Sequence, residues 1–264
     1  MKLSIIGGGN MGSAIACGLV QGSIFNPGDI TVIDIHETPL KALQRVNPSI
    51  RIALNDYDSV SFADMVVLAV KPWLISDTIA DIKFQLDYSK QMLVSIAAGV
   101  SIDNLNETLL KSTEPRLPAV FRLVPNTAIA VRQSMTLIAT KNASPEQQSL
   151  LLKIFDELGS AVLMDESKLV AGTALTSCGI AYLFRYIRAA MLAGVEMGFY
   201  PKDAQNLAVK TMLGAAALLD ATKENPETEI DKVTTPGGIT IKGLNELEAN
   251  GFSDAIIRAM RASR

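Results

Sequence analysis

The residues that most clearly suggest chemistry are the glycines near the start of the chain. The run Gly7-Gly8-Gly9-Asn10-Met11-Gly12 fits the pattern G-x-G-x-x-G, which binds dinucleotides where it follows a strand and opens a helix. In such a turn the first glycine permits a tight bend, the second lets a pyrophosphate approach the backbone, and the third lets the helix pack closely on the strand. The N–H groups at the helix start then bind the phosphates, so this turn predicts a dinucleotide site.

An acidic residue, Asp34, ends the second expected strand, 22 residues after Gly12. A carboxylate at this position can accept hydrogen bonds from the adenosine ribose and repels a 2′-phosphate, which favours NAD over NADP. The same carboxylate could instead be a strand end in solvent. His36 is the single histidine of the chain, and it would lie beside the ribose rather than near the reacting atoms. With one histidine, neither a Ser-His-Asp triad nor a His-based metal site is expected.

A second candidate site lies far along the chain, where Pro236-Gly237-Gly238 precedes an expected helix and Thr240 follows. Consecutive N–H groups at a helix N-terminus are a natural site for a carboxylate. Thr240 could cap the start of that helix. The same residues could also form only a turn followed by an ordinary cap.

The elements that must position these residues change in character near residue 165. Before it, short and almost continuously apolar runs alternate with helical stretches, a pattern typical of parallel strands covered on both faces. The expected strands cover residues 3–6, 30–34, 65–70, 92–97 and 120–124, with 136–140 and 161–164 as further strands around a helix opened by Ser144-Pro145-Glu146. After residue 165 only helices are expected, over 166–199, 201–222 and 240–262. We therefore predict an α/β fold: a Rossmann-type doubly wound parallel sheet over 1–165 and an all-α substrate and dimerisation domain over 166–264.

The composition narrows the possible functions. The chain is 48% hydrophobic and 19% charged, which is not the composition of a disordered protein. Its 24 basic and 27 acidic residues provide no basic excess for nucleic acid. The two cysteines, Cys17 and Cys178, form no C-x-x-C pair, and the chain start lacks the apolar core of a signal peptide. We expect a cytoplasmic protein with reduced thiols.

The second half is apolar around most of each helix, and such helices must be buried. The longest uncharged run, 169–184, has 16 residues, whereas a membrane span needs about 20. This length favours a buried helix pair and no membrane partner. Because so few helices cannot cover their own apolar surface, a homodimer or a higher assembly of dimers is expected.

Together with the opening glycines, four further segments resemble the pyrroline-5-carboxylate reductase family in order and spacing. They are Leu-Ala-Val-Lys-Pro at 68–72, Ser-Ile-Ala-Ala-Gly-Val at 95–100, Arg-Leu-Val-Pro-Asn-Thr at 122–127 and the segment 233–244. The specific signal is Thr-Pro-Gly-Gly-Ile-Thr within the last segment, since other Rossmann reductases share the first two. The resemblance implies an oxidoreductase that reduces a small cyclic imine with NAD(P)H, most simply 1-pyrroline-5-carboxylate to L-proline.

The resemblance also implies the site residues. Cofactor binding is expected at Gly7, Gly9, Asn10, Met11, Gly12, Asp34, Asn55, Ala69, Val70, Lys71, Pro72, Ala97 and Ala98. Substrate binding is expected at Gly237, Gly238, Ile239, Thr240, Ser177 and Cys178. Thr240 matches the hydroxyl that hydrogen-bonds or protonates the ring nitrogen and is the expected catalytic residue. Catalysis would then be mostly positioning plus one hydrogen bond, since the cofactor carries the hydride.

One segment departs from the family. Residues 176–182 read Thr-Ser-Cys-Gly-Ile-Ala-Tyr, where the family usually has Ser-Gly-Ser-Gly-Pro-Ala-Tyr. A reductase of a related imine therefore stays open, as does a non-catalytic NAD(P)H-binding sensor. A β-hydroxyacid dehydrogenase is disfavoured, because Lys168 and Gly172 do not fit its G-x-x-x-K-x-x-x-N pattern. Arg185 and Arg188 could bind a second carboxylate or form ion pairs across a dimer.

Overall fold

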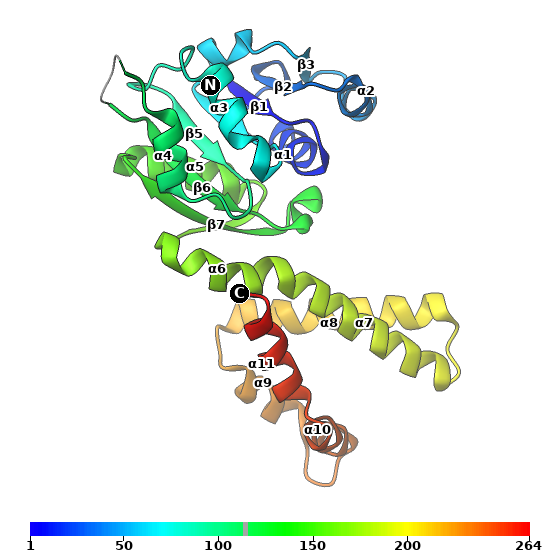
Figure 1. The fold of residues 1–264 in the computed structure, drawn as a ribbon. Coiled ribbons are helices and arrows are strands. Elements are labelled where there is room, and N and C mark those ends of the chain that lie inside the picture. Colours follow the sequence, from blue (N-terminus) through cyan, green and yellow to red (C-terminus); the bar gives the residue numbers. More distant parts are fainter. Residues whose placement is uncertain (113–115) are drawn as a thin grey trace. The chain divides into compact units, whose positions relative to one another are not determined.

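The computed structural model describes residues 1–112 and 116–264 (Figure 1). The chain separates into two compact units, Met1–Ser177 and Cys178–Arg264. This division falls later than the boundary predicted at residue 165, because the start of the helical part packs on the first unit. Leu169 is fully buried, and a Cβ on Gly172 would lie 2.3 Å from the Leu137 side chain.

Within the described residues the first unit contains one sheet of eight strands in the order β3-β2-β1-β4-β5-β6-β7-β8. The strands are β1 (Leu3–Ile6), β2 (Ile30–Asp34), β3 (Arg51–Leu54), β4 (Met65–Leu68), β5 (Met92–Ser95), β6 (Ala119–Val124), β7 (Ser134–Lys141) and β8 (Gly159–Leu163). Neighbouring strands are parallel except for β6 and β7, which are antiparallel. The predicted doubly wound parallel sheet is confirmed, with β7 and β8 extending it at one edge.

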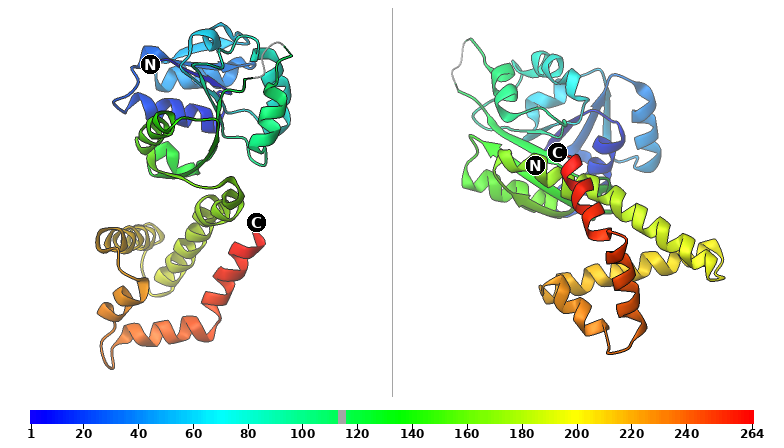
Figure 2. Two further views of the ribbon diagram at one scale, coloured as in Figure 1. Left: turned by 90° about the vertical axis from the view of Figure 1, so that its left-hand side faces the viewer. Right: turned by 60° about the horizontal axis from the view of Figure 1, so that its bottom comes forward.

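Helices cover both faces of this sheet (Figures 1 and 2). They are α1 (Asn10–Val20), α2 (Glu37–Val46), α3 (Ile75–Ile82), α4 (Ile102–Leu109) and α5 (Pro145–Asp156). One apolar cluster holds Ile15, Leu40 and Phe155 from α1, α2 and α5. The opposite cluster holds Ile79 and Leu105 from α3 and α4. Since both faces are buried, the strands need no polar alternation, which explains their continuous apolar runs.

The entry into the helical part is a single helical run rather than a helix pair. It comprises α6 (Leu169–Thr173), a π-helical turn at Ala174–Cys178 and α7 (Gly179–Glu196). The prediction of a buried helix pair over 169–184 is therefore wrong. The run Glu166–Glu196 is long and apolar enough to cross a membrane by length and composition, and only 11% of its most apolar stretch is buried inside the chain.

The second unit is helical throughout, as predicted. After α7 come α8 (Pro201–Thr222), α9 (Pro226–Val233), α10 (Ile239–Ala249) and α11 (Phe252–Ala262). The close approach of α7 and α8 needs a small residue, because a Cβ on Gly194 would lie 2.8 Å from the Ala204 Cβ. The helix expected over 240–262 is divided at Gly251, whose φ of 73° starts α11 in a new direction. The helix α9 was not expected.

Candidate active site

The glycine turn joins β1 to α1 with the geometry that the pattern predicts. Gly7 has a φ of +109°, and a Cβ there would lie 2.5 Å from the Ala69 carbonyl oxygen. A Cβ on Gly12 would lie 1.9 Å from the Gly7 carbonyl oxygen, so no other residue fits while α1 keeps its position. Gly9 is different: it is exposed, and nothing lies within 4 Å of its Cβ position.

The open side of the turn offers backbone donors. Gly9 is the N-cap of α1, and the first bond into the helix runs from the Ser13 N–H to the Gly9 carbonyl oxygen at 2.9 Å. The N–H groups of Asn10, Met11 and Gly12 precede that bond and have no acceptor within the helix. An unobstructed backbone with these donors fits a pyrophosphate.

Asp34 ties this turn to the ends of β2 and β3. Its Oδ2 accepts a hydrogen bond from the Gly8 N–H at 2.7 Å, and its Oδ1 accepts one from the His36 N–H at 2.8 Å. Asn55 follows β3 with a φ of 48°, and its N–H donates to the Asp34 carbonyl oxygen at 2.9 Å. Asp34 is therefore a half-buried anchor of the loop edge rather than a strand end in solvent. The structure brings Asp34, Asn55 and the glycine turn together.

The exits of β4 and β5 lie at the same edge of the sheet. The Ala69 N–H donates to the Ile6 carbonyl oxygen at 2.7 Å, so the segment Ala69-Val70-Lys71-Pro72 leaves the sheet directly beside Gly7. Both strands end before the predicted residues 70 and 97. This shortening places Ala69 and Ala97-Ala98 in loops at the carboxyl edge, where dinucleotides bind in open α/β sheets.

The π-helical turn that contains Ser177 is held by the segment after β6. The Asn126 side-chain N–H donates to the Thr176 carbonyl oxygen at 3.1 Å, and the Ser177 hydroxyl donates to the Pro125 carbonyl oxygen at 3.3 Å. Asn126 is buried, and it satisfies a carbonyl in an irregular turn of the kind that often marks functional sites. The sequence alone did not indicate that Asn126 would hold this turn, although its place before Thr127 is typical of a helix-capping Asn. Cys178 is partly buried.

A second polar contact holds the start of the helical run. Arg122 Nη1 lies 2.7 Å from Glu166 Oε1, with 12% and 30% of the side chains exposed. The same carboxylate oxygen accepts the Ile102 N–H at 2.8 Å, at the first residue of α4. Glu166 therefore joins β6 to the helix that follows the Ala97-Ala98 loop.

The turn before α10 corrects two details of the predicted substrate site. The Gly238 N–H donates to the Thr235 carbonyl oxygen at 2.9 Å, and Gly237 has a φ of +72°, which together define a type II turn. The N–H of Gly238 is therefore used inside the turn. The N-cap of α10 is Gly238, so Thr240 is the second residue of the helix and does not cap it.

The donors that remain lie one residue further along. The N–H groups of Ile239, Thr240 and Ile241 form the first turn of α10 and have no acceptor within the helix. All three residues are exposed. Gly238 packs tightly in this turn, because a Cβ there would lie 2.6 Å from the Thr235 hydroxyl oxygen and 3.0 Å from the Thr235 carbonyl oxygen. The first turn of α10 thus presents N–H donors and the Thr240 hydroxyl together, in the second unit, whereas the glycine turn belongs to the first.

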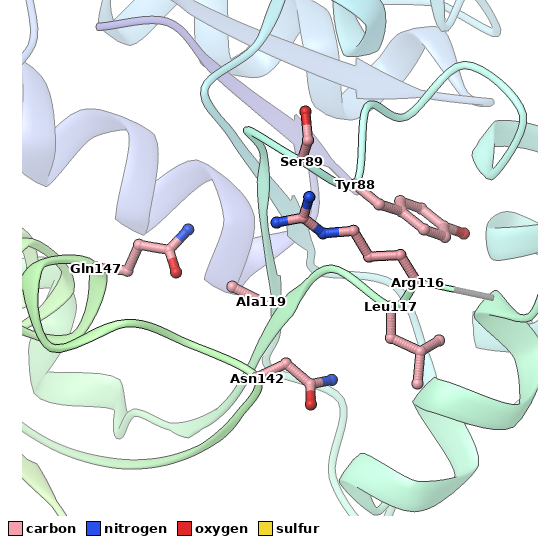
Figure 3. Close-up of a pocket in the computed structure, with 7 residues that line it drawn as sticks. All are labelled: Tyr88, Ser89, Arg116, Leu117, Ala119, Asn142 and Gln147. Carbon is pink, nitrogen blue, oxygen red and sulfur yellow. The ribbon is translucent and has the colours of Figure 1, made fainter. Parts of the chain in front are cut away.

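A cavity of about 390 Å³ lies away from these residues (Figure 3). It is lined by Tyr88, Ser89, Arg116, Leu117, Ala119, Asn142 and Gln147. Ala119 begins β6 and Asn142 follows β7, so the cavity is at the opposite edge of the sheet from the glycine turn. None of the predicted site residues lines it.

Comparison with known proteins agrees with this arrangement of parts. Residues 166–264 match the family model for pyrroline-5-carboxylate reductase dimerisation, and residues 2–99 match the model for NADP oxidoreductase, coenzyme F420-dependent. The fold and its glycine turn thus define an NAD(P)-dependent oxidoreductase with a helical dimerisation domain.

The full-length relatives identify the family. The chain is 37% identical to pyrroline-5-carboxylate reductase of Methanosarcina acetivorans, across 100% of this chain and 97% of that protein. It is 36% identical to pyrroline-5-carboxylate reductase 1 of Dictyostelium discoideum and spans 48% of that protein's length. The crystal structure of Plasmodium falciparum pyrroline carboxylate reductase with NADP bound has a TM-score of 0.85 at 25% identity, covering 100% of this chain and 95% of that chain. The chain belongs to the pyrroline-5-carboxylate reductase family.

Proposed function

We propose that this chain reduces 1-pyrroline-5-carboxylate to L-proline with NAD(P)H, the last step of proline biosynthesis. The observation that carries the proposal is the presence, in one chain that matches the family along its whole length, of an open glycine turn and a donor-bearing helix start. The first suits a dinucleotide, and the second suits a small carboxylate. The wider set of site residues is part of this proposal.

The first unit would hold the cofactor. The N–H groups that follow Gly9 suit the pyrophosphate, and the carboxylate of Asp34 with the side chain of Asn55 suits the adenosine ribose. Ala69–Pro72 and the small Ala97-Ala98 loop leave room for the nicotinamide end. When bound, the reduced nicotinamide supplies a hydride to the C=N carbon of the imine.

The start of α10 would hold the substrate. Its first N–H groups, with the positive end of the helix dipole, attract the substrate carboxylate. The Thr240 hydroxyl then donates a hydrogen bond to the ring nitrogen, which becomes more basic as hydride arrives. Such a bond strengthens toward the transition state, so it raises kcat more than it tightens substrate binding.

The proposal also covers the oligomeric state of the enzyme and its place in the cell. The exposed apolar residues of α7 and α8, among them Leu183, Phe184, Leu192 and Leu213, suit a homodimer or an assembly of dimers better than solvent. We place the enzyme in the cytoplasm, with neither nucleic acid nor membrane as a partner.

The test is cofactor oxidation by the full-length protein, with NADH and NADPH and three imines. These are 1-pyrroline-5-carboxylate, its six-membered homologue, and 1-pyrroline without the carboxylate. We expect the highest kcat/KM for the five-membered carboxylate and a large loss without the carboxylate. A preference for the six-membered ring would make the chain a reductase of a related imine, consistent with the departures at Ser177 and Cys178. Binding of NADH without oxidation by any imine would indicate the sensor instead.

A further inference from the structure

Asn126 is a buried asparagine whose side-chain amide makes a hydrogen bond at each end, and it is 7% exposed. The Oδ1 atom accepts from the Ala128 N–H at 3.0 Å, and the Nδ2 group donates to the Thr176 carbonyl oxygen at 3.1 Å. Capping the short helix Thr127–Val131 needs only the oxygen. The contact with Thr176 is therefore a separate role, and it requires an amide rather than a carboxylate.

The amide of Asn126 is held in place by the sheet. The Asn126 N–H donates to the Ser134 hydroxyl at 3.1 Å, and Ser134 is a buried residue at the start of β7. The Asn126 carbonyl oxygen accepts from the Ile129 N–H at 3.1 Å. A donor whose backbone and side chain are both fixed in this way can position the group to which it donates.

Asn126 lies at the edge of the sheet where the nicotinamide end of the cofactor is proposed to bind. The strand β6 is parallel to β5 and ends at Val124, two residues before Asn126. Parallel strands have their carboxyl ends at the same edge of a sheet. Asn126 therefore leaves the sheet at the same edge as the Ala97-Ala98 loop, which follows β5.

The group that Asn126 holds belongs to the π-helical turn Ala174–Cys178. This turn contains Ser177 and Cys178, which are part of the proposed substrate site. The Ser177 hydroxyl donates to the Pro125 carbonyl oxygen at 3.3 Å. Two adjacent residues after β6 thus hold two adjacent residues of the turn, and all four lie in the first unit.

We propose that Asn126 is a positioning residue for hydride transfer: through the Thr176 carbonyl it holds the substrate-contacting turn in register with the nicotinamide end of the cofactor. The inference rests on the proposed function and adds a residue that acts through the backbone of another. Misplacement of reacting groups by about 1 Å can cost about 100-fold in rate. We therefore expect loss of the Asn126 donor to slow hydride transfer about 10- to 100-fold, with little change in the Kd for NADPH.

Two variants separate the donor from the cap. Asn126→Asp keeps the oxygen that accepts from Ala128 but places an oxygen opposite the Thr176 carbonyl oxygen. Asn126→Ser keeps a capping hydroxyl on a shorter side chain without a charge, so it serves if Asn126→Asp folds poorly. Asn106→Ala is the matched control, because Asn106 is also 7% exposed, lies on α4, and has an Oδ1 atom without a hydrogen-bond partner among the described residues.

The experiment is a single turnover of the full-length protein, in which enzyme with bound NADPH is mixed rapidly with 1-pyrroline-5-carboxylate. The rate constant of NADPH oxidation reports hydride transfer, and deuterium at the transferred position should slow it. The amplitude reports the fraction of competent enzyme, so a merely structural defect lowers the amplitude and leaves the rate constant unchanged. We expect a lower rate constant with normal amplitude in both Asn126 variants and a wild-type rate constant in Asn106→Ala. Backbone hydrogen exchange over residues 174–178 should be faster in the Asn126 variants.

Four results overturn the inference while leaving the proposed function intact. They are a wild-type rate constant in both Asn126 variants, a loss of amplitude alone, an equal slowing in Asn106→Ala, and slower hydride transfer with unchanged hydrogen exchange over 174–178. The last result would place Asn126 itself against the substrate or the cofactor. If the wild-type protein oxidises neither NADPH nor NADH with any imine, the proposed function fails, and this inference fails with it.

Discussion

We expect the half-buried ion pair between Arg122 and Glu166 to stabilise the first unit. Glu166 Oε1 accepts from Arg122 Nη1 at 2.7 Å and from the Ile102 N–H at 2.8 Å. Arg122 Nε is buried without a hydrogen-bond partner among the described residues. In Glu166→Ala the guanidinium loses its counter-charge, and α4 loses the acceptor of its first N–H group.

The size of the effect depends on burial. Removing one partner of a fully buried pair costs about 3–5 kcal/mol, because the other charge stays unpaired. Here the Arg122 side chain is 12% exposed and that of Glu166 is 30% exposed, so water can reach part of the vacated space. We expect Glu166→Ala to lower the free energy of unfolding by about 2–3 kcal/mol. For a chain of this size that is a fall in Tm of roughly 5–10 °C.

The assay is thermal unfolding at fixed protein concentration without cofactor, supported by a double-mutant cycle. Glu166→Leu combined with Arg122→Met replaces both charges by apolar groups, so it should be less destabilising than the sum of the single changes. The matched control is Asp103→Ala, which breaks the exposed pair of Lys141 and Asp103 at 2.8 Å and should have little effect. A Glu166→Ala protein as stable as wild type would refute the reasoning, because a buried unpaired guanidinium cannot be free of cost.

Further predictions concern the two ends of the reaction and the assembly. Asp34→Ser should shift the kcat/KM ratio toward NADPH by roughly 1–2 kcal/mol, because a carboxylate facing a 2′-phosphate is removed. Its Tm must be compared as well, since Asp34 also anchors the Gly8 and His36 N–H groups; equal use of both cofactors, unchanged by the substitution, would exclude this role. Thr240→Val should lower kcat about 10- to 1000-fold with a small change in KM. Its Tm should be unchanged because Thr240 does not cap α10, and a wild-type kcat would show that water supplies the proton. Sedimentation equilibrium should find a dimer or larger species, and a stable monomer at micromolar concentration would contradict the proposed assembly.

Short sequence patterns correctly predicted most strands, the glycine turn and the start of α5, because neighbouring residues largely determine these features. The apolar runs identified most strands, because a strand covered on both faces has no polar side. The glycine pattern identified the turn between β1 and α1, because it places glycine at positions 7 and 12, where a Cβ would clash with the backbone. Ser144-Pro145 identified the start of α5, where a capping box is present.

Other features depend on contacts that no local pattern contains. The edge strand β3 has four residues, each half-buried or exposed, and β2 is its neighbour only in the folded sheet. The Gly238 N–H donates within the turn that Gly237 allows, so it is not available to a ligand. The available N–H donors are therefore those of the first turn of α10 rather than those of the two glycines. The π-helical turn is hydrogen-bonded by the side chain of Asn126, 50 residues earlier in the chain.

The apolar helical run Glu166–Glu196 shows why composition alone does not decide between a membrane and a protein partner. The length and hydropathy of this run suit either a membrane span or an interface with another protein, and few of its residues are buried inside the chain. The charges of Arg185 and Arg188 favour a protein interface over a membrane span. They lie in the second half of the run, and a charged side chain within a bilayer costs up to about 2.5–3.5 kcal/mol, the value at its middle. At a protein interface the same arginines can reach carboxylates or water at the rim, so their cost falls. Because the match to the reductase dimerisation domain begins at residue 166, with this run, a second copy of the chain accounts for both the apolar surface and the charges within it.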